Sequence, residues 1–326
     1  MKTPRTSVII PNWNGSKFLS PCLEALKRQS DQDFEVIVVD NHSTDDSLQT
    51  LEKDFPEVRV VQLDKNYGFA PAINRGVEQA RGEYLVFLNN DTEAEPNWLQ
   101  ELARAMKDNP KVGVADSKII LFSDRSKLDS VGIEYSRWGF STPRGRGQEE
   151  SQFTQDTEVF ACCGGSSILR RELIEQIGAY DESFFAYLED VDLSYRIRLA
   201  GYICETIPTS RIYHHLGQTS GGLTPFTRYH SIKNLWLVYL KNSPREVLWR
   251  TLPRFLLLQG LLLLSALRHG QILPPFKAYG YLLAHLGAVL RARRNIQRGM
   301  TADWRGVYKA MGRELPPHLN PLRRSP

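Results

Sequence analysis

The chain has 326 residues, 41% hydrophobic and 24% charged, which is the composition of a soluble globular protein and excludes a low-complexity sequence. The net charge is +4, but it is unevenly distributed along the chain. Residues 244–326 carry 14 Lys and Arg against 3 Asp and Glu, a balance of +11, and the rest of the chain carries −7. Four cysteines without CxxC spacing predict reduced thiols in a cytosolic protein and exclude a disulfide framework or a zinc site. The N-terminal residues contain no apolar signal segment, which argues against secretion.

Apolar runs alternate with amphipathic segments over the first 90 residues. The candidate strands are short, apolar and followed by polar turns: residues 7–11, 34–39, 58–63 and 84–88. The candidate helices carry apolar side chains on one side: residues 20–29, 45–53 and 71–79. Strands and helices that alternate at this spacing predict an α/β fold with a doubly wound sheet.

The next part of the chain has weaker periodicity. Residues 123–157 are polar and rich in Gly and Arg, which predicts long loops or a hairpin beside the site. We expect residues 159–169 to return to the sheet, and residues 170–177 and 189–200 to form helices. We therefore divide the chain into a catalytic domain over residues 1–243 and a basic, apolar helical region over residues 244–326.

Two apolar segments of that C-terminal region, residues 255–267 and 279–290, are flanked by arginines. The 13 residues of the first segment would rise only about 20 Å as a helix, which is too short to span a bilayer. The basic tail suits an anionic partner, and the apolar helices favour the cytoplasmic leaflet of the plasma membrane over nucleic acid. The alternative is a helical pair that packs on the catalytic domain or forms a homo-oligomer.

Ligands of doubly wound sheets bind beyond the C-terminal ends of the strands. Polar residues follow three of the predicted strands at residues 11–14, 40–43 and 89–91. Because these segments should meet along one edge of the sheet, we expect the chemistry there.

Asp40 ends the second predicted strand. A carboxylate only accepts hydrogen bonds, so it can bind the imide N–H of uracil or thymine, or cap the helix that starts near Asp45. A dinucleotide-binding fold would need a Gly-x-Gly-x-x-Gly turn after the first strand. That position instead holds Pro11, Asn12, Trp13, Asn14 and Gly15. The sequence therefore excludes an oxidoreductase of that fold.

Asp91 follows the fourth predicted strand. A carboxylate at this edge can hold Mg²⁺ or Mn²⁺ if a bound diphosphate supplies further oxygens, although an Asp turn before a helix near Pro96 is the alternative. Either His214 or His215 could complete the metal shell or contact phosphate.

An acidic cluster opens the predicted helix over residues 189–200. Acids in a first helical turn favour the helix dipole, but three in four residues exceed the needs of a cap. A partly buried carboxylate can act as a general base on a hydroxyl, and we assign this role to Asp190, with Glu189 as the second candidate. Asp192 is predicted to pair with Arg196 one helical turn later.

Together these segments resemble the family 2 inverting glycosyltransferases of the GT-A fold, in particular the bacterial rhamnosyltransferase-like branch. The resemblance spans about residues 6–243 and is carried by residues 8–15, 38–45, 66–70, 74–76, 82–92, 178–182 and 184–201. It implies a mixed sheet in which Asp40 binds the pyrimidine, Asp91 the metal and Asp190 the acceptor proton. This chain has Asn89, Asn90 and Asp91 where many relatives have Asp-x-Asp, so the identity of the metal stays open.

The resemblance also implies three groups of site residues. Those expected to bind the nucleotide-sugar are Pro11, Asn12, Asn14, Asp40, Asn41, Ser43, Asn66, Gly68, Asn74 and Asn90. Those expected to bind the divalent metal are Asp91, His214 and His215. The acceptor candidates are Trp138, Gly164, Gly165 and Lys233.

The expected reaction is a single displacement that moves rhamnose from dTDP-rhamnose, or a hexose from a UDP-sugar, to a hydroxyl of a glycan. A membrane-apposed tail suits a lipid-linked glycan in the synthesis of a cell-surface polysaccharide. Two alternatives remain open. A nucleotidyltransferase would need a Gly-rich basic loop after the first strand, and residues 14–17 match such a loop poorly. A non-catalytic, membrane-docked scaffold would share only the fold.

Overall fold

The computed structural model describes residues 3–216 and 224–314. The strands are β1 Thr6–Asn12, β2 Phe34–Asp40, β3 Arg59–Gln62, β4 Tyr84–Leu88, β5 Thr92–Ala94, β6 Val112–Leu121, β7 Leu128–Ser130, β8 Ile133–Tyr135, β9 Ser141–Pro143, β10 Thr157–Val159, β11 Ser166–Arg170 and β12 Ile203–His214. The α-helices are α1 Ser16–Lys27, α2 Ser47–Asp54, α3 Phe69–Gln79, α4 Trp98–Asp108, α5 Arg171–Ile177, α6 Glu189–Leu199, α7 Pro225–Asn242, α8 Arg245–Arg268, α9 Leu273–Arg298 and α10 Trp304–Ala310.

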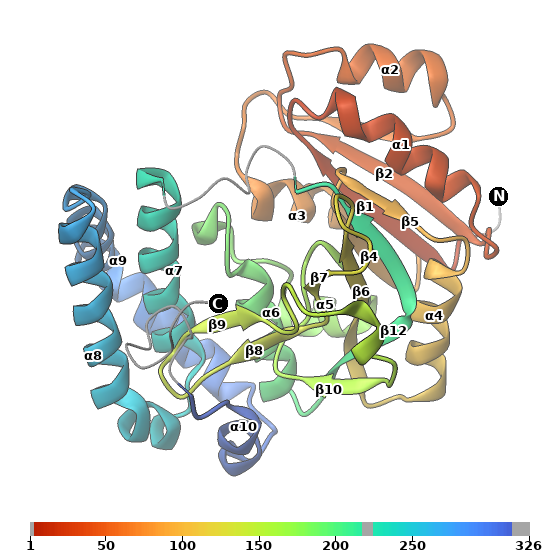
Figure 1. Cartoon of the computed structure of the whole chain (residues 1–326). Coiled ribbons are helices and arrows are strands. Elements are labelled where there is room, and N and C mark those ends of the chain that lie inside the picture. Colours follow the sequence, from red (N-terminus) through yellow and green to blue (C-terminus); the bar gives the residue numbers. More distant parts are fainter. Residues whose placement is uncertain (1–2, 217–223, 315–326) are drawn as a thin grey trace.

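A mixed β-sheet forms the centre of the molecule (Figure 1). Within the described residues its main path runs β10-β12-β6-β11-β4-β1-β2-β3, with β5 paired to β12 and β7 paired to β6. The apolar side chains of α1, α2 and α4 cover one face, and those of α3, α5 and α6 cover the other. This confirms the predicted doubly wound, mixed α/β sheet.

The register of the parallel strands aligns their polar ends. Strand β1 pairs with β2 so that Asn12 lies opposite Asp40, and β1 also pairs in parallel with β4. The ends of all three strands therefore meet at one edge of the sheet, as the sequence predicted.

The elements from residue 6 to residue 88 match their predicted positions, apart from small shifts at helix starts. The largest shift is that of α1, which begins at Ser16, four residues earlier than predicted. There the backbone N–H of Ser16 donates to the carboxylate of Asp45 at 2.9 Å, a contact across loops that sequence periodicity cannot show. The polar segment of residues 123–157 contains the expected hairpin, formed by β8 and β9.

A buried ion cluster joins α6 to α7. The carboxylate of Asp192 is fully buried and accepts hydrogen bonds from Arg196 at 3.0 Å, from Lys241 at 2.9 Å and from Asn242 at 2.8 Å. The predicted pairing of Asp192 with Arg196 is confirmed. Burial acts to raise the pKa of Asp192, but the positive charges of Lys241 and Arg196 outweigh burial and hold that pKa below its ordinary value.

Replacing Asp192 by Ala should lower the free energy of unfolding by about 3–5 kcal/mol, because it removes the buried carboxylate that Arg196 and Lys241 share. Lys241 keeps Asp181 as a second partner, whereas Arg196 loses its carboxylate. Urea unfolding followed by circular dichroism would measure the loss. The matched control is Glu134→Ala, at the exposed position of β8, which we expect to stay within about 0.5 kcal/mol of wild type. Since the pKa of Asp192 is lowered in the folded state, its contribution should be complete above pH ~4 and disappear as the pH falls further. A loss equal to that of the control would contradict this role.

The C-terminal helices differ in length from their prediction. Helix α8 has 24 residues and α9 has 26, so each predicted apolar segment is only part of a longer helix. The first segment is therefore part of a helix that is long enough to span a bilayer, and the prediction that it is too short is wrong. Within the described residues α8 is the one helix long and apolar enough to cross a membrane, by length and composition only, and a core helix of a soluble protein would meet the same criteria.

Helix α9 binds the C-terminal end of α7. The guanidinium of Arg293 donates to the carbonyl oxygens of Leu240 at 2.6 Å and Ser243 at 2.7 Å. The side-chain amide of Gln297 donates to the carbonyl oxygen of Asn242 at 2.9 Å. The last carbonyls of a helix have no partners within the helix, so these contacts from α9 satisfy and fix the end of α7.

Candidate active site

Asp40 lies at the centre of a hydrogen-bonded network at the ends of β1 and β2. One carboxylate oxygen accepts from the side-chain amide of Asn12 at 3.2 Å, and the other from the backbone N–H of Ser43 at 3.0 Å. The hydroxyl of Ser43 accepts in turn from the backbone N–H of Asn14 at 2.9 Å. A carboxylate has about four acceptor positions, so this fixed group keeps capacity for a further donor.

The amide of Asn41 connects the end of β2 with the loop before α3. Its nitrogen donates to the side-chain oxygen of Asn66 and to the carbonyl of Gly68, both at 3.0 Å. Gly68 has a φ of 97°, and a Cβ there would come within 2.6 Å of Phe185. Asn41, Asn66 and Gly68 therefore shape one wall of the edge beside Asp40.

Asn74 has a different environment from the other candidates. Its side-chain oxygen accepts from the backbone N–H of Tyr180 at 3.0 Å, and its nitrogen donates to the carbonyl of Tyr180 at 2.8 Å. Both ends of the amide are thus engaged in joining α3 to the segment before α6. We leave Asn74 out of the proposed donor contacts.

Asn90 ties β4 to β1. Its amide donates to the side-chain oxygen of Asn12 at 2.7 Å, and Asn12 in turn contacts Asp40. A Cβ on Gly15 would lie only 2.1 Å from the amide nitrogen of Asn90, so the chain needs glycine at the start of α1 to admit this contact. The segments after β1, β2 and β4 consequently form one connected network.

Asp91 and His214 face each other across the edge of the sheet. Strand β12 pairs with β5 so that His214 lies opposite Thr92, next to Asp91 in the chain. The Nε2 of His214 is 3.2 Å from an oxygen of Asp91, and its Nδ1 is 2.8 Å from Asp129. Burial alone would lower the pKa of His214, but the hydrogen bonds to Asp129 and Asp91 outweigh it and raise that pKa to about 9.

His215 points to other partners. Its Nε2 is 2.9 Å from the carboxylate of Glu93, and its ring stacks on Phe122 with 3.7 Å between ring centroids. Of the two adjacent histidines, it is therefore His214 whose ring lies against Asp91, while the ring of His215 lies against Glu93. Asp129 is a partner that sequence reasoning missed, because nothing in its local sequence marks it.

Asp91 and His214 would fit a divalent cation such as Mg²⁺ or Mn²⁺ once the cation displaces the proton that the two neighbouring carboxylates hold on the imidazole. One carboxylate oxygen and one imidazole nitrogen converge, and the carboxylate of Asp129 orients the imidazole from its other side, as carboxylates commonly do for metal-bound histidines. No group of three or more His, Cys, Asp or Glu within the described ranges is arranged to hold a metal. Further ligands would have to come from a bound substrate or water.

The candidate base Asp190 lies in the first turn of α6 and is partly exposed. Its carboxylate accepts from the backbone N–H of Gly164 at 3.1 Å, and a Cβ on Gly164 would come within 3.2 Å of the Cβ of Asp190. The neighbouring Gly165 accepts from the backbone N–H of Asn89 at 3.0 Å. The strand predicted over residues 159–169 begins only at Ser166, since residues 162–165 turn to make these contacts.

Burial raises the pKa values of the acids around Asp190. It raises the pKa of Asp190 against the opposing effect of the N–H groups of Gly164 and Val191. The pKa of Glu189 rises to about 8 through burial and the negative charge of Asp190. Asp116, which sequence reasoning missed, is fully buried on β6, accepts from the N–H of Cys163 at 2.8 Å, and has a pKa raised by burial to about 7.

Two of the four acceptor candidates, Trp138 and Lys233, contact other parts of the chain. Trp138 lies in the turn between β8 and β9, where the adjacent Gly139 packs on Phe255 of α8. Lys233 is buried, and its ammonium donates to the backbone carbonyl of Ser183 at 2.5 Å. Gly164 and Gly165 are the two candidates that contact the acid and the strand end.

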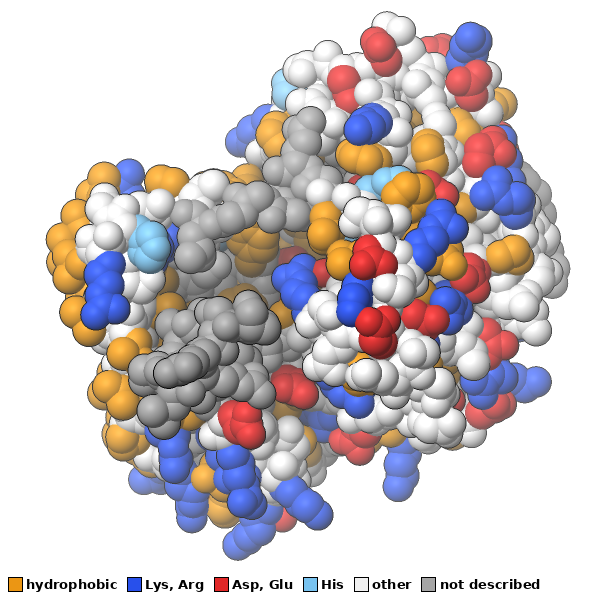
Figure 2. Space-filling view, viewed as in Figure 1, with side chains coloured by type: hydrophobic (Ala, Val, Ile, Leu, Met, Phe, Trp, Pro, Cys, Tyr) orange, Lys and Arg blue, Asp and Glu red, His pale blue; other side chains and the backbone are white. Residues whose placement is uncertain are grey.

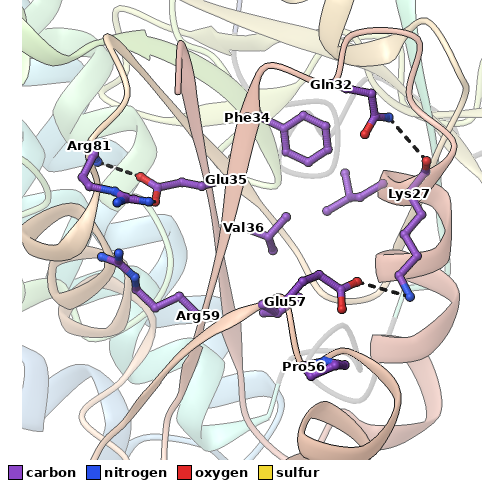
Figure 3. Close-up of a pocket in the computed structure, with 11 residues that line it drawn as sticks. Lys27, Gln32, Phe34, Glu35, Val36, Pro56, Glu57, Arg59 and Arg81 are labelled. Atoms are coloured by element: carbon purple, nitrogen blue, oxygen red, sulfur yellow. Dashed lines mark hydrogen bonds and ion pairs between the residues drawn. The ribbon is translucent and has the colours of Figure 1, made fainter. Parts of the chain in front are cut away.

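A pocket of about 590 Å³ lies at the N-terminal ends of β2 and β3, opposite to the C-terminal ends that carry the candidate residues (Figure 3). Its cationic lining includes Arg81, paired with Glu35 at 2.7 Å, and Lys27, which is 3.3 Å from Glu57. These charges already have partners, and the pocket contains none of the candidate residues. The candidate site is therefore the edge formed by the C-terminal ends of β1, β2 and β4.

Comparison with known proteins gives three results. Residues 7–178 match the model of the family described as Glycosyl transferase family 2. The O-antigen biosynthesis protein RfbC of Myxococcus xanthus is 31% identical over 261 residues, which is 74% of this chain but only 19% of RfbC, so the chain spans about a fifth of that relative. The N-acetylglucosaminyl-diphospho-decaprenol L-rhamnosyltransferase of Mycobacterium tuberculosis is 25% identical over 66% of this chain and 77% of that protein.

A solved structure of GalNAc-T7 with UDP, GalNAc and Mn²⁺ superposes on this chain with a TM-score of 0.61. The sequence identity is 18%, and the match covers 75% of this chain and 49% of GalNAc-T7. At this identity the likeness concerns the fold alone.

Proposed function

Because this chain belongs to glycosyl transferase family 2 and has the GT-A fold, we propose that it transfers a sugar from a pyrimidine-nucleotide donor to a glycan hydroxyl with inversion. The observation that carries the proposal is the convergence of distant acids on one sheet edge. Asp40 is linked through Asn12 to Asn90, directly before Asp91, and Asp190 is linked through the two glycines to Asn89.

The proposed reaction is a single displacement. The partly exposed carboxylate of Asp190 takes the proton from an acceptor hydroxyl, and that oxygen forms a bond to the anomeric carbon of the donor sugar. The bond between this carbon and the diphosphate oxygen breaks at the same time, and the nucleoside diphosphate leaves on the opposite face of the sugar. A base that is partly buried but still reachable suits this proton transfer.

Asp91 and His214 would hold the divalent cation, and Asp129 would orient the imidazole. When bound, the cation would neutralise negative charge on the leaving diphosphate. The Mn²⁺ in the GalNAc-T7 structure supports a divalent metal in this fold. His215 has no part in this proposal, because its ring is engaged by Glu93 and Phe122.

We propose rhamnose from dTDP-rhamnose as the first donor to test, with hexoses from UDP-sugars next. The similarity to the mycobacterial rhamnosyltransferase supports this order. The acceptor in that enzyme's name, N-acetylglucosaminyl-diphospho-decaprenol, supports a lipid-linked glycan. The O-antigen protein supports a role in making a cell-surface polysaccharide.

A nucleotide panel would test the donor site. Asp40 accepts hydrogen bonds only, so UDP and dTDP should raise the melting temperature in the presence of Mn²⁺, and CDP, which lacks the imide N–H, should do so much less. Asp40→Asn should weaken UDP binding by about 10- to 100-fold, the loss expected for a hydrogen bond to a charged group. Incubation with dTDP-rhamnose and a lipid-linked acceptor should then release dTDP. Release of pyrophosphate would indicate a nucleotidyltransferase, and no response to any nucleotide would indicate a scaffold.

We also propose that α8 and α9 dock on the inner face of the plasma membrane. Exposed apolar side chains lie along both helices, on the side drawn at the left in Figure 2. On α9 they recur every seven residues at Phe276, Leu283 and Leu290, which places them on one side of the helix. Between residues 245 and 298 the two helices and their connection contain a single acidic residue, Glu246, so charge complementarity favours an anionic lipid surface.

Sedimentation with vesicles would test this docking. The full chain should bind vesicles that contain anionic phosphatidylglycerol, with an affinity that falls as salt is raised. Serine in place of Phe276, Leu283 and Leu290 together should weaken binding at least ~10-fold, since each apolar side chain contributes about 1.5–3 kcal/mol when buried. Neutral phosphatidylcholine vesicles are the control. Equal binding of wild type and the triple variant would contradict this surface.

A further inference from the structure

The backbone before α6 is strained. Phe185, Tyr187 and Leu188 have φ values of 62°, 71° and 68°, in the left-handed region that non-glycine residues rarely adopt. Such conformations cost free energy and persist only where neighbouring groups hold them. Leu188 is the residue from which α6 starts, and Asp190 follows two residues later. Whatever holds this turn therefore sets the position of Asp190.

Asn234 of α7 is the residue that holds the turn. It is fully buried, and its amide nitrogen lies 3.2 Å from the carbonyl oxygen of Phe184, 2.8 Å from that of Ala186 and 2.6 Å from that of Tyr187. An amide has only two N–H groups, so three carbonyls share them. The preceding Lys233 adds a hydrogen bond to the carbonyl of Ser183.

The other end of the Asn234 amide supports this interpretation. Its Oδ1 is buried and has no hydrogen-bond partner in the described part of the chain. A buried acceptor without a partner is costly, so this position keeps asparagine for its N–H donors. An apolar residue of similar size would avoid that cost, but it would take the side-chain donor away from the carbonyls of Ala186 and Tyr187. The carbonyl of Phe184 would keep the N–H of Ala186 at 2.7 Å.

Helix α7 also holds α6 on the far side of Asp190. Eight residues beyond Asn234, the amide of Asn242 donates to the carboxylate of Asp192 at 2.8 Å. The base candidate therefore lies between two contacts from one helix. Asn234 fixes the left-handed turn before Asp190, and Asn242 fixes the first turn of α6 after it.

We propose that Asn234 is a positioning residue, which orients Asp190 for proton transfer by locking the left-handed turn before α6. The inference rests on the proposed role of Asp190 as the base. Asn234 acts through the backbone, so its loss should change the rate of the chemical step. The turn also contacts the wall of the donor site, because the carbonyl of Phe185 accepts from the N–H of Phe69 at 2.6 Å, and donor binding should therefore change much less than the rate but need not stay identical.

Asn234→Leu is the test, with Val247→Ala on α8 as the control. This control removes buried volume from the same hydrophobic cluster as Phe184 but removes none of the hydrogen bonds to the turn. In the full-length chain we expect the leucine variant to lower kcat about 100-fold, the scale of a misplaced catalytic group, with KM for the donor within about twofold. Amide hydrogen exchange over residues 185–190 should become at least ~10-fold faster in this variant and stay unchanged in the control.

The two readouts separate the possible failures. Unchanged exchange over residues 185–190 would overturn the inference whatever the enzyme does. Faster exchange with a kcat equal to that of Val247→Ala would also overturn it, since the turn would then not matter for the rate. If Asp190→Asn keeps wild-type transfer, the proposed function of Asp190 fails instead, and the exchange data still report on the turn.

Discussion

Asp190→Asn is expected to lower the rate of sugar transfer by about 10²- to 10⁴-fold, the usual contribution of a general base, and to leave the Kd of the nucleotide donor within about twofold. Asparagine keeps the shape of the side chain and an oxygen to accept from the N–H of Gly164. It loses the ability to accept a proton. Single-turnover kinetics and calorimetry with UDP would measure the two quantities separately.

The control is Asp124→Asn, an acid of an exposed loop, which should not change either quantity. The pH profile gives an independent check. The base works in its ionised form, and burial raises the pKa of Asp190. The rate should therefore rise with pH through a pKa above the ordinary ~3.9 of aspartate. A variant that transfers sugar at the wild-type rate would exclude Asp190 as the base.

Asp91→Asn is expected to lower the affinity for Mn²⁺ at least ~100-fold when the metal is titrated calorimetrically in the presence of UDP. This substitution removes the charged oxygen that faces His214 at 3.2 Å. Asp129→Asn, which acts only by orienting the imidazole, should lower the affinity by about 10- to 100-fold. EDTA should abolish transfer by wild type, and added Mn²⁺ should restore it.

Glu93→Gln is the matched control for Asp129→Asn, because each acid binds the ring of one of two adjacent histidines. The Glu93 variant should keep wild-type affinity for the metal. A large loss in this variant with none in Asp129→Asn would transfer the assignment from His214 to His215.

The sequence was sufficient for the parts of the site that lie at strand ends. Apolar runs and their polar stops predicted β1, β2 and β4, and parallel strands bring such stops together without further information. The amino-acid pattern alone therefore places Asp40, Asn90 and Asp91 at one edge of the sheet.

The remaining contacts join segments far apart in the chain. The proposed choice of His214 over His215 depends on the pairing of β12 with β5, and Asp129 contacts the ring of His214 from 85 residues away in the chain. Asn234 contacts a turn almost 50 residues earlier, and its own sequence is that of an ordinary helix. The length of α8 was missed for another reason, since a search for apolar runs stops at the arginines of its first turns.

Because α9 binds the C-terminal end of α7, removing α9 should disturb α7. Cutting after Ser243 would remove Arg293 and Gln297 and leave the last carbonyls of α7 open to water. The C-terminal end of α7, which contacts Asp192, would then fray, and α7 would hold Asp190 less firmly. Fragments that lack residues 244–326 should for this reason transfer sugar slowly, even where they still bind nucleotide. If α9 contacts a bilayer as proposed, that contact would also act on α7 and through it on the proposed base.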